Sequence, residues 1–480
     1  MSTESNTEHT STSASNAASA KESLERTLRR RIDAQQEDIL DQLCHLVSIP
    51  SVAWESHDLA QVEHSAEAVA DLAREAGFPE VEILRAPRPD GEQGMPAVVA
   101  RRPAREGCPT VLLYAHHDVQ PADDLSDWKT SPFTASRQGE RLFGRGAADD
   151  KAGVMVHLSA ARLLFEQLGE DLGVGLTLFI EGEEEAGSPS FENFLAEYED
   201  RLNAQVIVVA DSANWRAGVP ALTSSLRGMI AGTVRVRTMD HALHSGMFGG
   251  PLLDATTVMV RLLSTLHDED GAVAVSGLVQ APDPAVDYAE SDFRADSGVF
   301  EQTRLAGRGS IASRLWTQPA LSIIGMDVTS VEASSNTMNA SSAARLSMRL
   351  APGQDPQAAH QALRRHLEDH APFGAEVVYE PVEQGQPYEA ESDSPAAGAI
   401  LEAMRQAWGV DPVLMGMGGS IPFVASLTER FPQASILITG IEDPDTRAHS
   451  ANESLYLPDF WRAIEAEALF LTRVDAQGRA

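Results

Sequence analysis

The first half of the chain alternates between helical and fully apolar patterns. Residues 22–48 carry leucine and isoleucine at helical spacing up to Pro50, and a second helical pattern covers 58–76 and stops at Gly77. Further along, buried strands are predicted at 111–114, 176–180 and 206–209, and a helix at 152–167. Continuous apolar strands separated by helices are typical of a mainly parallel sheet with helices on both faces.

The pattern changes near residue 224. Residues 229–237 alternate between apolar and polar side chains, as in a strand with one face in water. The elements that follow are a helix at 251–267, polar loops at 268–318, and a strand, helix and strand at 343–350, 355–370 and 375–381. They predict a separate two-layer α+β domain.

The earlier pattern then returns, with a helix at 395–408, a strand at 435–439 and a helix at 458–473. We therefore expect an α/β domain interrupted by a smaller inserted one. The predicted boundaries are a disordered tail at 1–20, rich in Ser, Thr, Asn and Ala, the first part of the α/β domain at 21–223, the inserted domain at 224–388, and the second part of the α/β domain at 389–480.

Composition excludes several kinds of partner. The chain has 37 Lys and Arg against 71 Asp and Glu, a formal net charge of −34, which argues against binding to nucleic acid or anionic membranes. The sequence contains no run of 18 apolar residues that would indicate a membrane span. Its N-terminal residues lack the basic region and apolar stretch expected of a secretory signal. Cys44 and Cys108 are the only cysteines, too few for a disulfide framework, so we expect a cytoplasmic protein.

Candidate metal ligands follow the predicted strands of the α/β domain. Ligands of open α/β sheets bind at the carboxyl ends of the strands. Imidazole and carboxylate donors in this mixture suit two divalent ions of the zinc type, which predicts metal-assisted hydrolysis. The five candidates are His116, Asp149, Glu185, Asp211 and His449.

The local sequence suggests how these side chains divide the work. In His116-His117-Asp118, Asp118 can orient the ligating imidazole of His116, and His117 is expected to line the pocket. Asp149 can bridge two cations, because a carboxylate accepts from both at once. Adjacent Glu184 and Glu185 can divide the roles of metal ligand and proton acceptor.

Each segment taken alone has a simpler explanation. His116 and His449 could be structural histidines, and Asp149 could simply begin a helix, where an acid favours the positive end of the dipole. The cluster of glutamates at 181–185 could be a solvated acidic loop. The metal-site hypothesis depends on all the segments together.

Five longer motifs resemble those of metallopeptidase family 20, the aminoacylases, carboxypeptidase G and carnosinase-like dipeptidases. They are Tyr114–Pro121 (YAHHDVQP), Gly144–Lys151 (GRGAADDK), Glu181–Ser188 (EGEEEAGS), Leu243–Gly250 (LHSGMFGG) and Gly418–Pro422 (GGSIP). The last two are most similar to the carnosinase-like dipeptidase branch. The resemblance extends in order from about residue 30 to 475.

This resemblance implies two zinc ions, with manganese or cobalt as alternatives. His116, Asp149 and Asp211 would hold one ion, and Asp149, Glu185 and His449 the other. Glu184 would be the general base and then the general acid, Asp118 would orient His116, and a metal-bridging hydroxide would attack the amide.

The resemblance also gives the inserted domain a role. It would be a lid and dimerisation domain, so a homodimer is expected, and His244 would reach the partner's active site to polarise the scissile carbonyl. Arg349 would grip the substrate carboxylate as a planar charged fork. Asn336, Gly419 and Ser420 would complete the substrate site.

The sequence departs from the family pattern at three places, of which the last lies near the substrate end. Ala115 replaces a usual Gly, Asn339 stands where Pro is usual, and Gly416-Met417 replace a common Arg-Glu. The last change removes two charges. It leaves open which dipeptide is cleaved.

Three functions remain in competition. The first is a dipeptidase acting on small peptides. The second is a deacylase of N-acyl amino acids, of the acetylornithine or succinyl-diaminopimelate type, with the same metal site. The third is a non-catalytic metal-binding or scaffold protein, which the presence of all five ligands and the base disfavours.

Overall fold

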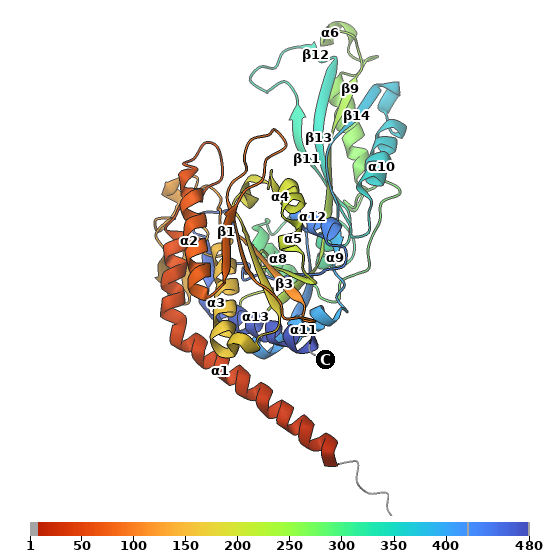
Figure 1. Cartoon of the computed structure of the whole chain (residues 1–480). Helices are drawn as coiled ribbons and strands as arrows, with labels where there is room; N and C mark the ends of the chain where they lie inside the picture. Colours follow the sequence, from red (N-terminus) through yellow and green to blue (C-terminus); the bar gives the residue numbers. More distant parts are fainter. Residues whose placement is uncertain (1–7, 420–421, 479–480) are drawn as a thin grey trace, which may run out of the picture. The chain divides into compact units, whose positions relative to one another are not determined.

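The computed structural model describes residues 8–419 and 422–478 (Figure 1). The chain divides into two compact units, which are described separately. The first unit comprises Met1–Leu222, Glu391–Val413 and Arg430–Ala480, and the second comprises Thr223–Ala390 and Leu414–Glu429. Residues 414–429, which we predicted in the α/β domain, belong to the second unit, where β16 (Val413–Met417) pairs with β8 (Ala221–Leu226).

The first unit is built on a mixed sheet, in the order β1-β2-β6-β3-β7-β17. Its strands are β1 (Glu80–Leu84), β2 (Ala97–Arg102), β3 (Thr110–His116), β6 (Gly175–Glu181), β7 (Val206–Val209) and β17 (Ser435–Ile438). β6, β3, β7 and β17 are mutually parallel, whereas β1 and β2 form an antiparallel edge. The predicted α/β class with a mainly parallel sheet is confirmed.

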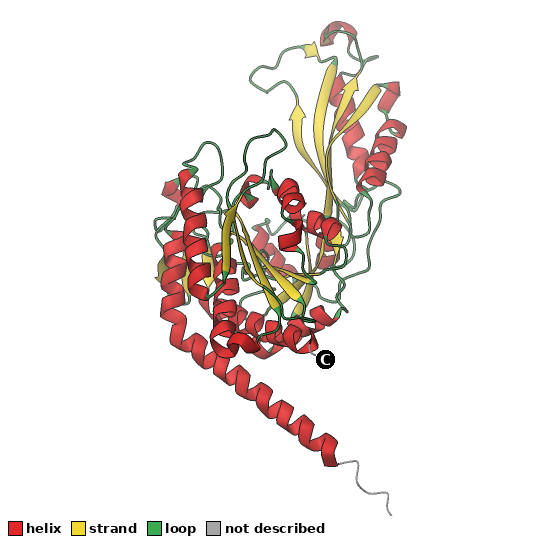
Figure 2. Ribbon diagram, viewed as in Figure 1, coloured by secondary structure: helices red, strands yellow, loops and turns green. Residues whose placement is uncertain are grey.

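Helices cover both faces of this sheet (Figure 2). Leu113 and Leu178 point to one face, where they join the core formed with α1, α2, α3, α11 and α13. Tyr114 and Phe179 point to the other, where the ring of Phe179 stacks on Phe194 of α4 at 5.0 Å. Both faces of the sheet are covered, so every residue of β6 is buried. This explains why the sequence of the strand is almost continuously apolar.

The helix bounds of the first unit follow its sequence signals. Gly77 ends α2 in a left-handed conformation with φ 103°, as a C-cap glycine does. The helices are α1 (Glu8–Val47), α2 (Ala60–Ala76), α3 (Lys151–Leu168), α4 (Phe191–Glu197), α5 (Glu199–Leu202), α11 (Pro395–Trp408) and α13 (Leu457–Gly478). A small sheet contains β4 (Ser136–Gln138), β5 (Arg141–Phe143) and β18 (Ser454–Tyr456).

The helix α1 differs from the prediction at its start. It begins at Glu8, within the segment 1–20 that we predicted as a disordered tail. Helix extension is cooperative, so the Ala- and Ser-containing stretch continues the helix that the downstream leucines establish. Residues 1–7 lie outside the described residues.

The second unit contains a four-stranded antiparallel sheet, in the order β11-β13-β9-β14. The strands are β9 (Gly228–Arg237), β11 (Ala320–Asp327), β13 (Ser341–Leu350) and β14 (Glu376–Gly385). Helices α7 (Ala255–Leu263) and α10 (Pro356–Asp369) pack on it around a core that includes Val234, Leu262 and Leu363. It is therefore a two-layer α+β arrangement.

Shorter elements complete the second unit. The segment predicted as loops at 268–318 contains two short helices. The elements are β10 (Leu243–His244), β12 (Thr337–Met338), β15 (Tyr388–Glu389), α6 (Ser245–Phe248), α8 (Glu290–Ser297), α9 (Ile311–Trp316) and α12 (Pro422–Arg430).

None of the described helices is both long enough and apolar enough to cross a membrane.

Candidate metal centre

Parallel strands of the first unit bring the acidic segments to one edge of the sheet. His116 is the last residue of β3, and Glu184 and Glu185 lie in a 3-10 turn (Glu184–Ala186) just after β6. Asp211 follows β7, and Asp149 precedes α3. Because β3, β6 and β7 are parallel, their carboxyl ends meet at this edge.

His116, Asp149 and Asp211 lie together beneath the surface. Nε2 of His116 is 3.1 Å from Oδ1 of Asp149 and 4.0 Å from Oδ1 of Asp211. The imidazole is fully buried. Nδ1 of His116 is 3.1 Å from the carbonyl oxygen of Asp118, which leaves Nε2 directed at the two carboxylates.

A second group forms around His449, which comes from the loop between β17 and β18. Nε2 of His449 lies 3.0 Å from Oδ2 of Asp149 and 3.2 Å from Oε2 of Glu185. The side chain of His449 is 58% exposed, so this half of the site opens to solvent. Gln120 also donates from Nε2 to Oε2 of Glu185, at 2.7 Å.

Asp149 stands between the two groups. Its Oδ1 faces His116 and its Oδ2 faces His449. A carboxylate that directs each oxygen at a different imidazole has the arrangement required to bridge two cations. The five side chains that the sequence singles out as ligands therefore meet at one place.

Asp118 organises the glutamates as well as the histidine. Its Oδ1 accepts a hydrogen bond from the backbone N–H of Glu184 at 3.1 Å, and its Oδ2 accepts from that of Glu185 at 3.0 Å. Oδ1 of Asp118 is 3.5 Å from Nδ1 of His116. One carboxylate thus fixes the turn that carries the proposed base and a proposed ligand.

The four glutamates of the acidic motif have different environments. Both carboxylate oxygens of Glu183 accept from backbone amides, those of Met95 and Ser190. Glu181 accepts from the hydroxyl of Tyr114 at 2.6 Å. Glu184 instead lies in a cluster with His116 and Asp211. Of the motif, Glu184 and Glu185 face the site.

The electrostatics of the cluster favour bound cations. Burial and the neighbouring Asp149 raise the pKa of Asp211 to about 7, and burial with Asp211 raises the pKa of Glu184 well above its usual range. Hydrogen bonds to Asp149 and Glu185 raise the pKa of His449 to about 11. Carboxylates crowded in this way repel one another, and divalent ions would offset that repulsion. The oxygen and imidazole donor set fits such ions.

The remaining predicted residues belong to the second unit or lie outside the described residues. His244 is exposed, and its Nδ1 accepts from the N–H of Gly246 at 3.1 Å. Asn336 is exposed beside β12, and Arg349 is half-buried on β13. Gly419 follows β16, and Ser420 lies outside the described residues.

Sequence reasoning missed a second arginine beside Arg349. Arg227 precedes β9, is 7% exposed, and donates from Nε to the carbonyl of Gly418 at 3.2 Å. Arg349 lies opposite Met229 in the β13–β9 register, two residues along the chain from Arg227. Burial and the charge of Arg349 lower the pKa of Arg227 to about 10. The signal available was a single arginine between two strand patterns, which is too weak to interpret alone.

His117 differs from its prediction. It is fully buried, with Nε2 2.9 Å from the carbonyl oxygen of Pro96, and burial lowers its pKa to about 4. It is therefore a core histidine and not part of a pocket wall.

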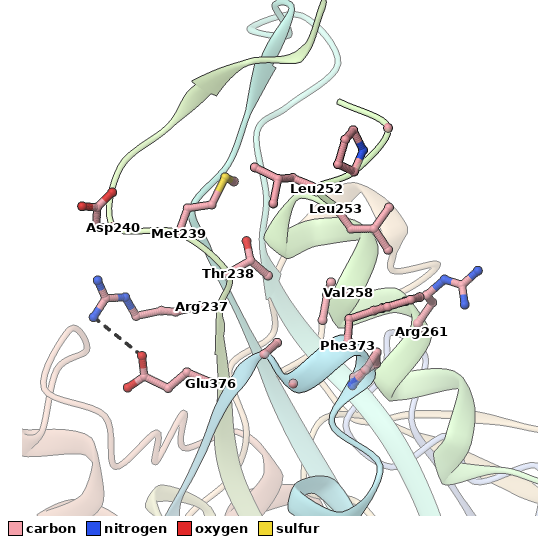
Figure 3. A pocket seen from close by; sticks show the side chains of 15 residues that line it. Arg237, Thr238, Met239, Asp240, Leu252, Leu253, Val258, Arg261, Phe373 and Glu376 are labelled. Atoms are coloured by element: carbon pink, nitrogen blue, oxygen red, sulfur yellow. Dashed lines mark ion pairs between the residues drawn. The ribbon is translucent and has the colours of Figure 1, made fainter. Parts of the chain in front are cut away.

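A pocket of about 720 Å³ lies within the second unit (Figure 3). Its walls come from the end of β9 and the residues after it, from α7 and the segment before it, and from the segment that leads into β14. Arg237 pairs with Glu376 at 3.9 Å, and the guanidinium of Arg261 lies 5.7 Å from the ring centre of Phe373. None of the predicted site residues lines this pocket.

Imidazole and carboxylate donors at the strand ends of an α/β fold are the arrangement that a metal-dependent hydrolase requires. The sequence model of peptidase family M20/M25/M40 matches residues 112–473. The chain therefore belongs to this peptidase family, and it is a hydrolase.

Several relatives resemble the chain over most of its length. A cysteinylglycine-S-conjugate dipeptidase of Corynebacterium striatum is 32% identical over 76% of this chain and 80% of its own. The human Beta-Ala-His dipeptidase is 28% identical over 92% of this chain and 90% of its own. The crystal structure of human carnosine dipeptidase 1 superposes with a TM-score of 0.74 at 26% identity, covering 94% of this chain and 99% of that one.

Proposed function

We propose that this protein is a dipeptidase that uses two divalent metal ions, with zinc as the resident metal. The observation that carries the proposal is the position of Asp149, whose two carboxylate oxygens face His116 and His449 at 3.1 and 3.0 Å. The dipeptidase activity named for the similar relatives supports the choice of substrate.

His116, Asp149 and Asp211 would hold one ion, and Asp149, Glu185 and His449 the other. Bound there, the ions would polarise the scissile carbonyl and lower the pKa of water to about 7. Manganese and cobalt accept the same donors, so metal analysis decides among them.

Glu184 is the proposed proton carrier. It accepts the proton of the attacking water and delivers it to the leaving nitrogen, which requires a carboxylate close to the reacting atoms. Its position beside His116 and Asp211 and the hydrogen bond of its backbone to Asp118 support this role. Asp118 acts by holding the turn and His116 in place.

The pair Arg227 and Arg349 would bind the carboxylate end of the peptide. The strand register brings the two arginines near each other, and the charge of Arg349 lowers the pKa of Arg227. An anionic substrate group bound by both would offset the repulsion between their charges. Asn336, Gly419, Ser420 and His244 are the further proposed contacts. His244 would act on the active site of a second copy of the chain, in a homodimer formed through the inserted domain.

We also propose that the enzyme works in the cytoplasm. Cys44 and Cys108 are both half-buried and form no disulfide, which is compatible with a reducing compartment.

Purified protein assayed with dipeptides and with N-acetyl and N-succinyl amino acids tests the proposal. We expect hydrolysis of dipeptides that stops when a chelator removes the metal and returns with zinc. Hydrolysis of the acylated amino acids but not of dipeptides would contradict the proposal and show that the enzyme is a deacylase.

A further inference from the structure

Glu453 connects two metal-binding segments that are distant in the sequence. Its carboxylate is fully buried, and four donors surround it. Oε2 accepts from Nη1 of Arg145 at 2.8 Å and from the N–H of Gly146 at 3.0 Å. Oε1 accepts from the N–H groups of Ala148 and Asp149 at 3.0 and 3.1 Å.

All four donors belong to the loop that leads to Asp149. The backbone adds a fifth link, because the N–H of Gly144 donates to the carbonyl of Glu453 at 3.0 Å. One of the four donors is the N–H of Asp149 itself. The position of the bridging carboxylate therefore depends directly on Glu453.

Arg145 supplies the charge that a buried carboxylate requires. Its side chain is 2% exposed and lies over the ring of Trp128, 5.4 Å from the centre. Its Nη2 also donates to the carbonyl oxygens of Pro121 and Ser450, both at 3.3 Å. Arg145 thus contacts the loop after β3 and the residue next to His449.

His449 needs such support more than His116 does. His116 is the end of a buried strand, whereas His449 lies in an exposed loop with φ 60°. Arg447 and Asn452 have φ 60° and 67°, and non-glycine residues seldom adopt this left-handed backbone unless their surroundings impose it. Asn452 is anchored by hydrogen bonds to Asp127 and Lys129, and Glu453 is anchored to Arg145.

We propose that the Glu453–Arg145 pair is a positioning device that sets the distance between Asp149 and His449, and so controls selectively the affinity of the metal ion that these two residues share with Glu185. This inference rests on the proposed two-ion function. The ion held by His116, Asp149 and Asp211 has two ligands that the pair does not touch, so it should respond less.

The test is a zinc titration of metal-free protein, competed with a chelator to resolve two affinities. In Glu453→Gln one carboxylate oxygen becomes an amide nitrogen, which cannot accept from its donors. We expect one of the two zinc affinities to fall about tenfold or more, as for other groups that orient metal ligands, with the other nearly unchanged. Added zinc should restore peptide hydrolysis.

Asp475→Asn is the matched control. Asp475 is also a buried carboxylate of the first unit that accepts from two backbone amides, those of Gly173 and Val174, both at 2.7 Å. These amides precede β6, at the opposite end of that strand from the metal site. Both amides donate to Oδ1, which Asn retains as an acceptor, so the control should fold and both zinc affinities should stay as in the wild type.

Arg145→Lys provides a second variant in case Glu453→Gln does not fold. It keeps the charge but loses the fork that reaches Glu453, Pro121 and Ser450, so the same selective loss is expected to a smaller degree. Unchanged affinities in a folded variant, or an equal loss of both ions, would overturn the proposal. A wild-type protein that binds fewer than two ions would instead overturn the proposed function.

Discussion

The imidazole Nε2 of His449 lies 3.0 Å from Oδ2 of Asp149, although one residue precedes the inserted domain in the chain and the other follows it. The other oxygen of Asp149 faces His116. The site is therefore completed only when the C-terminal part of the first unit folds against the N-terminal part. This arrangement makes metal binding and folding of the first unit interdependent.

Replacing Glu184 by Gln should lower kcat by about a hundredfold or more, because the amide cannot carry the proton. Metal content should stay at the wild-type value, since Glu184 is not among the proposed ligands. Steady-state kinetics together with elemental analysis measure both. Glu183→Gln is the control from the same motif: it should lower the melting temperature, because Glu183 holds backbone amides, and keep kcat near normal. Normal turnover in Glu184→Gln would show that Glu184 is not the general base.

Replacing Asp118 by Asn should reduce kcat and zinc affinity together. The amide nitrogen cannot accept a hydrogen bond, so one of the N–H groups of Glu184 and Glu185 loses its partner. A loss of about ten- to a hundredfold in metal affinity is expected for such a partner. Zinc titration and kinetics on the same sample measure it, and wild-type values for both would contradict the role.

Replacing Arg349 by Lys should raise KM for dipeptides more than it lowers kcat, because a point charge replaces a planar fork. The same change should have little effect on a peptide whose C-terminal carboxylate is amidated, which the wild type should already cleave poorly. Comparing the two substrates in both proteins measures the effect. An equal rise in KM for both substrates would show that Arg349 does not contact the carboxylate.

Mixing two inactive variants tests the homodimer. If His244 acts on the partner's site, a heterodimer of His244→Ala with Glu184→Gln contains one complete site, formed by His244 of one copy and Glu184 of the other. Subunit exchange should then recover up to about half of the wild-type activity per heterodimer. If no activity returned although subunit exchange was verified, His244 would have no role in the active site of the partner.

The stability of the metal-free protein should depend on the protonation of Glu181. Burial raises the pKa of Glu181 from 4.5 to about 8, so the folded state holds a proton that the unfolded chain has lost. The stability that the folded protein gains by keeping Glu181 protonated is complete below about pH 4.5. It is lost as the pH rises through about 8, where the folded carboxyl ionises. Urea unfolding of wild type and Glu181→Gln across this range should give a flatter pH dependence for the variant. Glu37→Gln, on the exposed face of α1, is the control. Parallel pH curves for all three proteins would contradict the assignment.

The strongest sequence signals correspond to buried elements. The apolar strands 111–114, 176–180 and 206–209 lie within β3, β6 and β7, because burial on both faces leaves a continuous apolar run. The antiparallel strand β1 was missed, since only Val81, Ile83 and Leu84 are apolar and its residues are partly exposed. β11 was missed for the same reason, with four successive exposed positions.

The candidate site was predictable where a residue follows a strong strand pattern. His116 is the last residue of β3, and Glu185 lies in the turn just after β6. Glu453 and Arg227 gave no comparable signal, because their roles depend on partners from distant segments that no local pattern brings together. The same limitation applied to His117, whose burial depends on a contact with Pro96.

The most direct test of the two-ion centre is anomalous diffraction at the zinc edge from crystals grown with saturating zinc. Two peaks about 3.5–4 Å apart, on either side of the Asp149 carboxylate, are predicted. One of them should contact His116 and Asp211, and the other Glu185 and His449. A single peak, or none, would contradict the account.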